Sequence, residues 1–143
     1  MSEENHCGML IRQINNALEK RCNNRLKETG LTISQMSALI EIADTPGQKL
    51  TFKELEKRMA LAQSTTAGLI SRLEQKKLVL VFGDQSDKRI KYVEITSLGI
   101  EYCHNARQDM DNTEMELLEH FSDQEKELFL SLLKKINFNL KDT

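Results

Sequence analysis

The sequence predicts a mainly α-helical protein with one short β-hairpin, and three observations lead to this fold class. The 143 residues include one proline and six glycines, so few positions favour a break in a helix. Apolar residues recur every three or four positions over most of the chain, which is the spacing of one helix face. Between residues 78 and 95 the spacing changes to alternation, which is typical of strands. This length suits one domain, or one domain with a dimerisation arm.

Composition and charge exclude several classes of protein. Hydrophobic residues make up 39% of the chain and charged residues 29%, which fits neither a disordered nor a collagen-like protein. The longest apolar run, residues 78–82, is far shorter than the roughly 20 residues of a membrane span, so we expect no membrane partner. The acidic, polar N-terminus predicts no secretory signal. Three cysteines at no disulfide or zinc-ribbon spacing favour a reduced, cytoplasmic protein without a metal or other cofactor.

The N-terminal segment, residues 1–31, is predicted to form one helix. Apolar side chains recur there every four residues, at Leu10, Ile14, Leu18, Cys22 and Leu26. The helix should end near Gly30, because glycine readily adopts the left-handed conformation that stops a helix. We expect this helix to contribute to dimerisation and its stripe, including Cys22, to be buried.

A second helix should begin after Thr32, because Thr32 and Gln35 have the spacing of a capping box. Its expected inward residues are Met36, Leu39, Ile40 and Ala43. The sequence Asp-Thr-Pro-Gly at 44–47 is the strongest break in the chain and should end this helix.

A helix-turn-helix follows. Thr51 and Glu54 form a second capping box, which opens a short helix carrying Leu55 and Met59 on one side. After a brief interruption at residues 60–62, a further helix has an apolar face formed by Thr66, Leu69, Ile70 and Leu73. Two helices joined by three or four residues form a helix-turn-helix.

A β-hairpin is predicted directly after it. Residues 78–82 are rich in β-prone side chains, residues 83–87 have the composition of a loop, and residues 90–95 alternate as in a strand. A hairpin in this place is a wing, so residues 32–96 are predicted to form a winged helix-turn-helix with a two-stranded wing.

The C-terminal segment, residues 97–143, is predicted to be helical again. One helix of up to about 24 residues should follow Thr96, and a third capping box at Ser122 and Glu125 should open a last helix rich in leucine. The total is about six helices. The two ends of the chain carry more apolar residues than one small domain can hide, which predicts a homodimer formed by the N- and C-terminal helices.

The regional charge indicates a nucleic-acid partner although the whole chain has a net charge of −2. Residues 51–96 hold nine basic and six acidic side chains, a net +3, which leaves −5 for the remainder. Phosphate binding needs a local positive field rather than a positive protein. The last helix of the helix-turn-helix begins with Gln63, Ser64 and Thr65, short polar side chains that can reach phosphates and base edges. The alternative is that these residues only cap and solvate the helix.

The wing and its surroundings resemble those of the MarR-type winged-helix transcriptional regulators. The resemblance is carried by Asp87-Lys88-Arg89, then Ile95-Thr96, then Gly99. The segments at residues 72–74 with 78–79, and at 30–32 with Leu39, are also similar to this family, and the order of elements agrees over residues 8–140.

The resemblance implies a homodimer that binds a roughly palindromic operator in double-stranded DNA, usually as a repressor released by a small-molecule effector or by oxidation. It implies that Arg89 enters the minor groove and that Asp87 braces the wing by pairing with Arg72. The expected DNA-binding residues are Gln63, Ser64, Thr65, Arg72, Lys88 and Arg89.

Several features depart from the family pattern or concern other functions. Gly68 replaces a frequent arginine, Ala62 a common capping residue, Lys77 a helix-ending glycine, and Val81 a frequent basic residue. The alternative function is therefore a winged-helix dimer that serves as a protein-interaction module with weak DNA affinity.

Cys7 is a candidate redox sensor. No phosphate loop, nucleophile elbow or HExxH motif is present, so we expect no enzyme.

Overall fold

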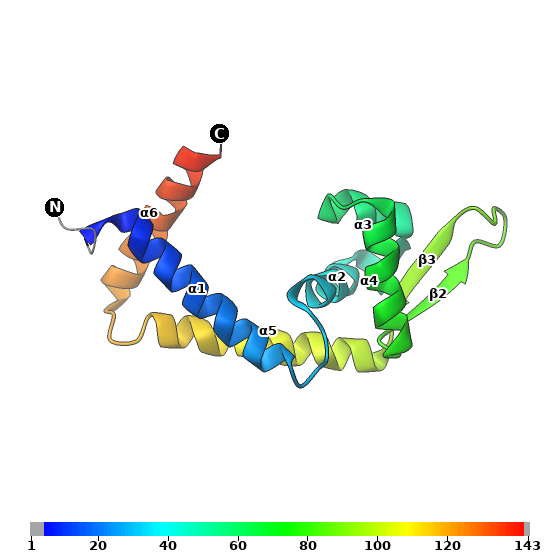
Figure 1. Ribbon diagram of the computed structural model, residues 1–143, viewed down its shortest axis with the longest axis horizontal. Coiled ribbons are helices and arrows are strands. Elements are labelled where there is room, and N and C mark those ends of the chain that lie inside the picture. Colours follow the sequence, from blue (N-terminus) through cyan, green and yellow to red (C-terminus); the bar gives the residue numbers. More distant parts are fainter. Residues whose placement is uncertain (1–4, 142–143) are drawn as a thin grey trace. The chain divides into compact units, whose positions relative to one another are not determined.

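The computed structural model describes residues 5–141 as a mainly helical, winged-helix fold (Figure 1). In chain order the elements are α1 (Cys7–Leu26), α2 (Ile33–Asp44), the 3-10 turn η2 (Pro46–Gln48), β1 (Lys49–Thr51), α3 (Phe52–Met59), α4 (Gln63–Gln75), β2 (Val79–Gly83), β3 (Lys91–Ile95), α5 (Ser97–Leu117) and α6 (Asp123–Leu140). The predicted fold class is confirmed. Most of the acidic N-terminal stretch, residues 1–4, lies outside the described residues. The chain divides into two compact units, residues 1–103 and 104–143.

All three predicted capping boxes are present. Thr32, Thr51 and Ser122 each accept, at 3.1 Å, the backbone N–H of the residue three positions further on. The side chain of that residue in turn accepts the N–H of the capping residue. These local pairs fix the first turns of α2, α3 and α6. In contrast, α4 follows Ala62, which provides no side-chain cap.

The core of the first unit lies between α2, α3, α4 and the sheet. The predicted inner face of α4 is confirmed, since Thr66, Leu69, Ile70 and Leu73 are all buried. The predicted face of α2 is only partly correct. Met36 and Leu39 are buried, but Ile40 and Ala43 are half-buried, whereas Ala38 and Ile42 are fully buried. The reason is that α2 contacts α1, α3, α4 and the sheet, so its buried arc is wider than one helical stripe.

The sheet contains a strand that the sequence analysis missed. Its order is β1-β3-β2 and both pairings are antiparallel, with Leu50 and Val81 opposite Val93 on its two sides. The predicted two-stranded wing is therefore part of a three-stranded sheet. With three residues, of which only Leu50 is buried, β1 is too short to show an alternating pattern.

One junction joins the end of α4, the sheet and the start of α5. The Thr96 hydroxyl donates to the Lys77 carbonyl at 2.8 Å and accepts the Gly99 N–H at 3.1 Å. The Thr96 N–H donates to the Leu78 carbonyl at 3.0 Å. A Cβ on Gly99 would lie 2.6 Å from Ile95 Cγ1 and would overlap the Leu78 carbonyl oxygen. The pattern of Thr96 followed by Gly99 therefore has a packing cause.

The helix α1 exposes most of its apolar side chains. Among its residues only Leu26 is buried, whereas Met9, Leu10, Ile11 and Ile14 are 40–47% exposed. The expectation that Cys22 lies in the core is wrong for the single chain, because its side chain is exposed. Of the predicted stripe, Leu26 is buried and Leu18 is half-buried, whereas Leu10, Ile14 and Cys22 are exposed.

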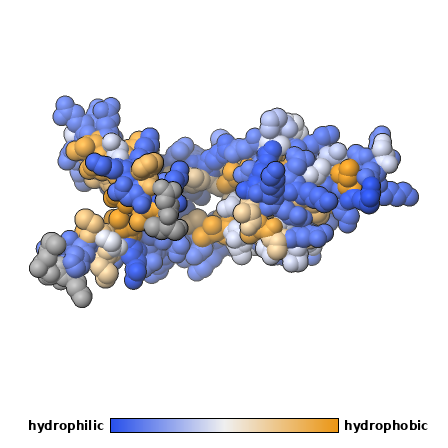
Figure 2. Space-filling model, turned by 90° about the horizontal axis from the view of Figure 1, so that it is seen from above, coloured by the Kyte–Doolittle hydropathy of each residue, from blue (hydrophilic) through white to orange (hydrophobic). Residues whose placement is uncertain are grey.

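The second unit also exposes apolar side chains. The predicted long helix has 21 residues and ends at Leu117, and His120 adopts a left-handed conformation (φ 68°) in the turn that follows. Phe121 then stacks on Phe129 of α6, with ring centroids 5.7 Å apart. No residue of α6 is buried. Hydrophobic side chains appear in orange on the surface in Figure 2. Within residues 5–141, no helix has the length and apolar character needed to span a membrane.

Candidate nucleic-acid interface

The start of α4 presents polar side chains to solvent. Gln63, Ser64 and Thr65 are exposed, whereas the buried face of the same helix begins at Thr66. The exposed side chain of Arg72 lies two turns further along α4. This arrangement agrees with the amphipathic pattern of the sequence, and it leaves the first turn of α4 free to contact a ligand.

A compact turn fixes α4 relative to α3. Ala60 ends α3 in the left-handed conformation with φ 53°. Its N–H donates to the Lys57 carbonyl at 3.3 Å, and the Leu61 N–H donates to the Glu56 carbonyl at 3.1 Å. These two bonds form a Schellman motif, which satisfies the last carbonyl groups of α3.

The tip of the wing carries exposed cations. Lys88 is exposed, and the Arg89 side chain is 91% exposed. The Arg89 guanidinium donates to both carboxylate oxygens of Asp87, each at 3.1 Å, and the Arg89 N–H donates to Asp87 Oδ1 at 3.0 Å. The guanidinium bonded to Asp87 lowers the pKa of that carboxyl below its ordinary value.

The expected pairing of Asp87 with Arg72 is corrected by this geometry. Among the described residues, no hydrogen bond or ion pair joins the two side chains. Asp87 instead binds a cation two residues away in its own loop. A carboxylate and a guanidinium in the same turn meet at little entropic cost, which favours this local pair.

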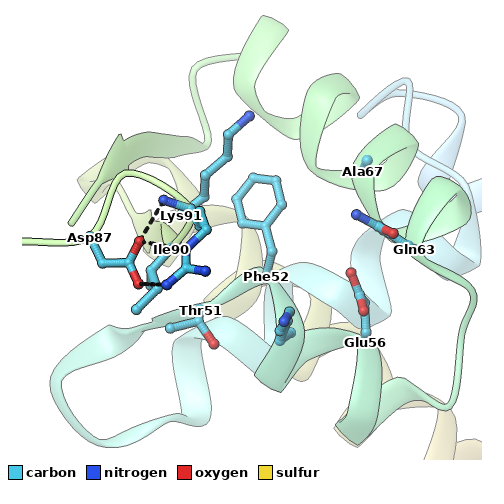
Figure 3. Close-up of a pocket in the computed structure, with 10 residues that line it drawn as sticks. Thr51, Phe52, Glu56, Gln63, Ala67, Asp87, Ile90 and Lys91 are labelled. Atoms are coloured by element: carbon cyan, nitrogen blue, oxygen red, sulfur yellow. Dashed lines mark hydrogen bonds and ion pairs between the residues drawn. The ribbon is translucent and has the colours of Figure 1, made fainter.

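A groove of about 660 Å³ lies between α3, α4 and the wing (Figure 3). The ring of Phe52 stands between the wing residues and Gln63. The groove brings together two of the predicted site residues on α4 and the wing, Gln63 and Arg89, along with Asp87. Ser64, Thr65, Arg72 and Lys88 do not line it. The full lining is Thr51, Phe52, Lys53, Glu56, Gln63, Ala67, Asp87, Arg89, Ile90 and Lys91.

Two cations of this groove were missed as individual site residues. Lys53 in the first turn of α3 and Lys91 at the start of β3 both line it. Each contributed to the regional charge, but no sequence motif placed them beside Arg89. In contrast, Arg58 has a structural role, because its guanidinium donates to Thr45 Oγ1 at 2.7 Å and lies 3.9 Å from Glu41. It joins α3 to the end of α2.

Cys22 is exposed and Cys103 is buried, and Cys7 is exposed in the first turn of α1. Its role as a redox sensor stays a prediction. Within residues 5–141, no group of three or more His, Cys, Asp or Glu side chains is arranged to bind a metal ion.

Comparison with known proteins decides the family. Residues 29–90 match the model of the MarR family. The transcriptional regulator HosA of Escherichia coli is 31% identical over 106 residues, which cover 74% of this chain and 77% of HosA. The chain belongs to the MarR family. A regulator of the helix-turn-helix type from Bacillus subtilis, YxaD, is 35% identical over 85 residues, 59% of each protein. Family membership makes this chain a DNA-binding transcriptional regulator and not an enzyme, as expected.

Solved structures agree with the fold. The Staphylococcus aureus regulator MepR, described as a transcription regulator of a multidrug efflux pump, superposes with a TM-score of 0.82 at 24% identity, covering 95% of this chain and 99% of MepR. AbsC, a MarR family transcriptional regulator from Streptomyces coelicolor, gives a TM-score of 0.73 at 18% identity, covering 100% of this chain and 98% of AbsC. These similarities confirm the winged-helix architecture.

Proposed function

We propose that this MarR-family chain is a homodimeric repressor that binds a roughly palindromic operator in double-stranded DNA. The observation that carries the proposal is the groove, which places the exposed polar start of α4 opposite the cationic tip of the wing. A helix fits the major groove of B-form DNA, and an arginine on a wing fits the neighbouring minor groove. A solved complex of MepR with DNA, whose protein has a TM-score of 0.75 to this chain, supports the proposal.

The helix α4 would read the major groove. Gln63, Ser64 and Thr65 are exposed in its first turn, the part of a recognition helix that contacts base edges. Arg72 would contact a phosphate, because its long side chain is exposed on the same helix beyond the first turn. The open first turn after Ala62 adds backbone N–H groups that favour phosphate.

The wing would read the minor groove. Arg89 would enter it, with Asp87 bracing the guanidinium from within the same loop. Lys88 at the tip, and Lys53 and Lys91 along the groove, would contact the phosphates on either side.

Dimerisation would use residues 1–31 and 97–143. The exposed apolar side chains of α1 and the absence of buried residues in α6 support this, because exposed apolar rows of this kind mark interaction surfaces. A two-fold dimer would place two copies of α4 about one turn of DNA apart, which would suit a roughly palindromic operator. We further propose that the dimer acts in the cytoplasm and that a small-molecule effector, or oxidation of Cys7, releases it from DNA.

The test is a selection of bound genomic fragments followed by a salt titration with the preferred fragment. We expect a preferred site that persists at physiological salt and a steep decrease of affinity with salt. Arg89→Ala should weaken binding and reduce the slope of log affinity against log salt by about 1. Lys126→Ala, which removes an exposed cation far from the wing in the sequence, serves as the matched control once sedimentation shows that it dimerises as the wild type does. Equal micromolar binding to all fragments would support the protein-interaction module instead.

A further inference from the structure

The loop of the wing, residues 84–90, is longer than a tight hairpin turn and needs additional bonds to hold one shape. Two backbone bonds close it. The Asp84 N–H donates to the Ile90 carbonyl at 2.9 Å, and the Ile90 N–H donates to the Asp87 carbonyl at 3.1 Å. The N–H groups at the tip of the loop need other acceptors.

The carboxylate of Asp84 accepts two of them. Its Oδ2 accepts the N–H of Ser86 and the N–H of Asp87, both at 3.0 Å. Asp84 is half-buried, whereas Gln85 and Ser86 are exposed. Bonds from a charged carboxylate to backbone amides are among the stronger hydrogen bonds in proteins, and an aspartate in this place organises a turn locally.

Asp84 also lies close to a side chain of the sheet. The negative charge of Asp84 lies near the Tyr92 hydroxyl on β3 and raises the pKa of Tyr92. The Tyr92 ring is held in turn by stacking on Phe82, with centroids 5.5 Å apart, and by Lys49 Nζ, which lies 5.8 Å from the ring centroid. The carboxylate therefore lies beside a ring whose own contacts reach all three strands.

We propose that Asp84 is a positioning residue for Arg89, a role that rests on the proposed binding of DNA by the wing. Asp84 holds the backbone N–H of Asp87, and the Asp87 carboxylate holds both the backbone and the guanidinium of Arg89. Asp84 thus acts on the tip of the wing through one intermediate residue. Asp84 fixes the position of the Arg89 side chain at the tip of the wing and makes no DNA contact itself.

The direction in which DNA affinity changes when Asp84 is removed distinguishes this positioning role from a purely electrostatic one. Removing a negative charge beside a phosphate-binding surface should strengthen binding to DNA if charge alone mattered. If Asp84 positions Arg89, its removal should weaken binding, because a disordered loop must be ordered again on the DNA. The two explanations predict opposite changes.

The experiment is a double-mutant cycle on the selected operator fragment. We expect Asp84→Ala to weaken operator binding by about tenfold, the size of one lost charge-assisted hydrogen bond. Asp84→Asn should retain part of the affinity, because its amide oxygen still accepts an N–H. Ser86→Ala is the matched control and should bind as the wild type does, since the bond uses its backbone N–H. In the Arg89→Ala background, Asp84→Ala should have little further effect.

Binding that is equal or tighter in Asp84→Ala, or losses that simply add in the double variant, would overturn the proposal. Amide hydrogen exchange of the free protein tests the geometry without DNA. The N–H groups of Ser86 and Asp87 should exchange faster in Asp84→Ala, while the thermal midpoint stays that of the wild type. Unchanged exchange would also overturn the proposal. If the wild type selects no fragment, the proposed function fails, and the exchange result still decides whether Asp84 holds the loop.

Discussion

Replacing glycine by alanine should have opposite effects at two helical positions of the same unit, Gly99 and Gly68. In the interior of a helix, alanine stabilises the helix by about 1 kcal/mol relative to glycine. At Gly68 on α4 the new methyl group would meet no atom within 4 Å, so we expect Gly68→Ala to stabilise the chain by up to about 1 kcal/mol. At Gly99 the methyl group would overlap the Leu78 carbonyl oxygen and lie 2.6 Å from Ile95 Cγ1.

The neighbours of Gly99 cannot easily move. The Leu78 carbonyl accepts the Thr96 N–H at 3.0 Å, so shifting it would weaken the junction between the sheet and α5. Overpacking of this kind costs about 1–3 kcal/mol, which exceeds the small gain in helix propensity near the start of α5. We therefore expect Gly99→Ala to destabilise the chain by about 1–2 kcal/mol.

The assay is urea unfolding followed by circular dichroism, with all variants at one protein concentration because dimerisation adds to the apparent stability. Each variant is the control for the other, since both gain the same methyl group in a helix. A Gly99→Ala variant as stable as the wild type would refute the close approach of α5 to the sheet. A loss of stability in Gly68→Ala would refute the open space beside α4.

Three further predictions concern a helix end, a titration and the assembly. Lys77 ends α4 with φ 64°, so Lys77→Gly should stabilise the chain by about 0.5–1 kcal/mol in the same unfolding assay, whereas Lys77→Ala should not. Arg89 lowers the pKa of Asp87 in the folded protein, so the bond between them stabilises the folded wing fully at a pH above the pKa that this carboxyl has in the unfolded chain. This stabilisation is lost as the pH falls through the lower pKa of the folded state. An NMR titration should show this low pKa, and Arg89→Ala should raise it; an unchanged value would contradict the pairing. Phe138 is 72% exposed on α6, so Phe138→Glu should shift sedimentation toward the monomer, with Asn139→Glu as the matched control. A dimer unaffected by Phe138→Glu would remove this side chain from the interface.

Local signals in the sequence predicted local structure well. The capping boxes at Thr32, Thr51 and Ser122 are each formed within four residues, so spacing alone reveals them. The inner face of α4 was also predictable, because one side of this helix packs on the core and its apolar period is regular. The wing followed from a change of period between Leu78 and Ile95.

Contacts between distant residues were not predictable in the same way. The strand β1 exists because Leu50 pairs beside Val93, more than forty positions away in the chain. Arg58 counted toward the basic charge of the region, yet its partner Thr45 lies at the end of a different helix. Lys53 and Lys91 become neighbours of one groove only after the chain folds. Sequence patterns give composition and period, whereas these positions depend on tertiary packing.

The uncapped start of α4 has a consequence for any attempt to increase the thermal stability of this protein. Standard stability engineering would introduce a capping residue at Ala62 and replace Gly68 by alanine. Each change should raise the free energy of unfolding by about 1 kcal/mol. Both positions are exposed, one just before and one within the helix proposed to read DNA. A variant selected for heat resistance alone would therefore accumulate changes on the surface that selection for operator binding would conserve, and its tolerance to heat and its regulatory activity would diverge.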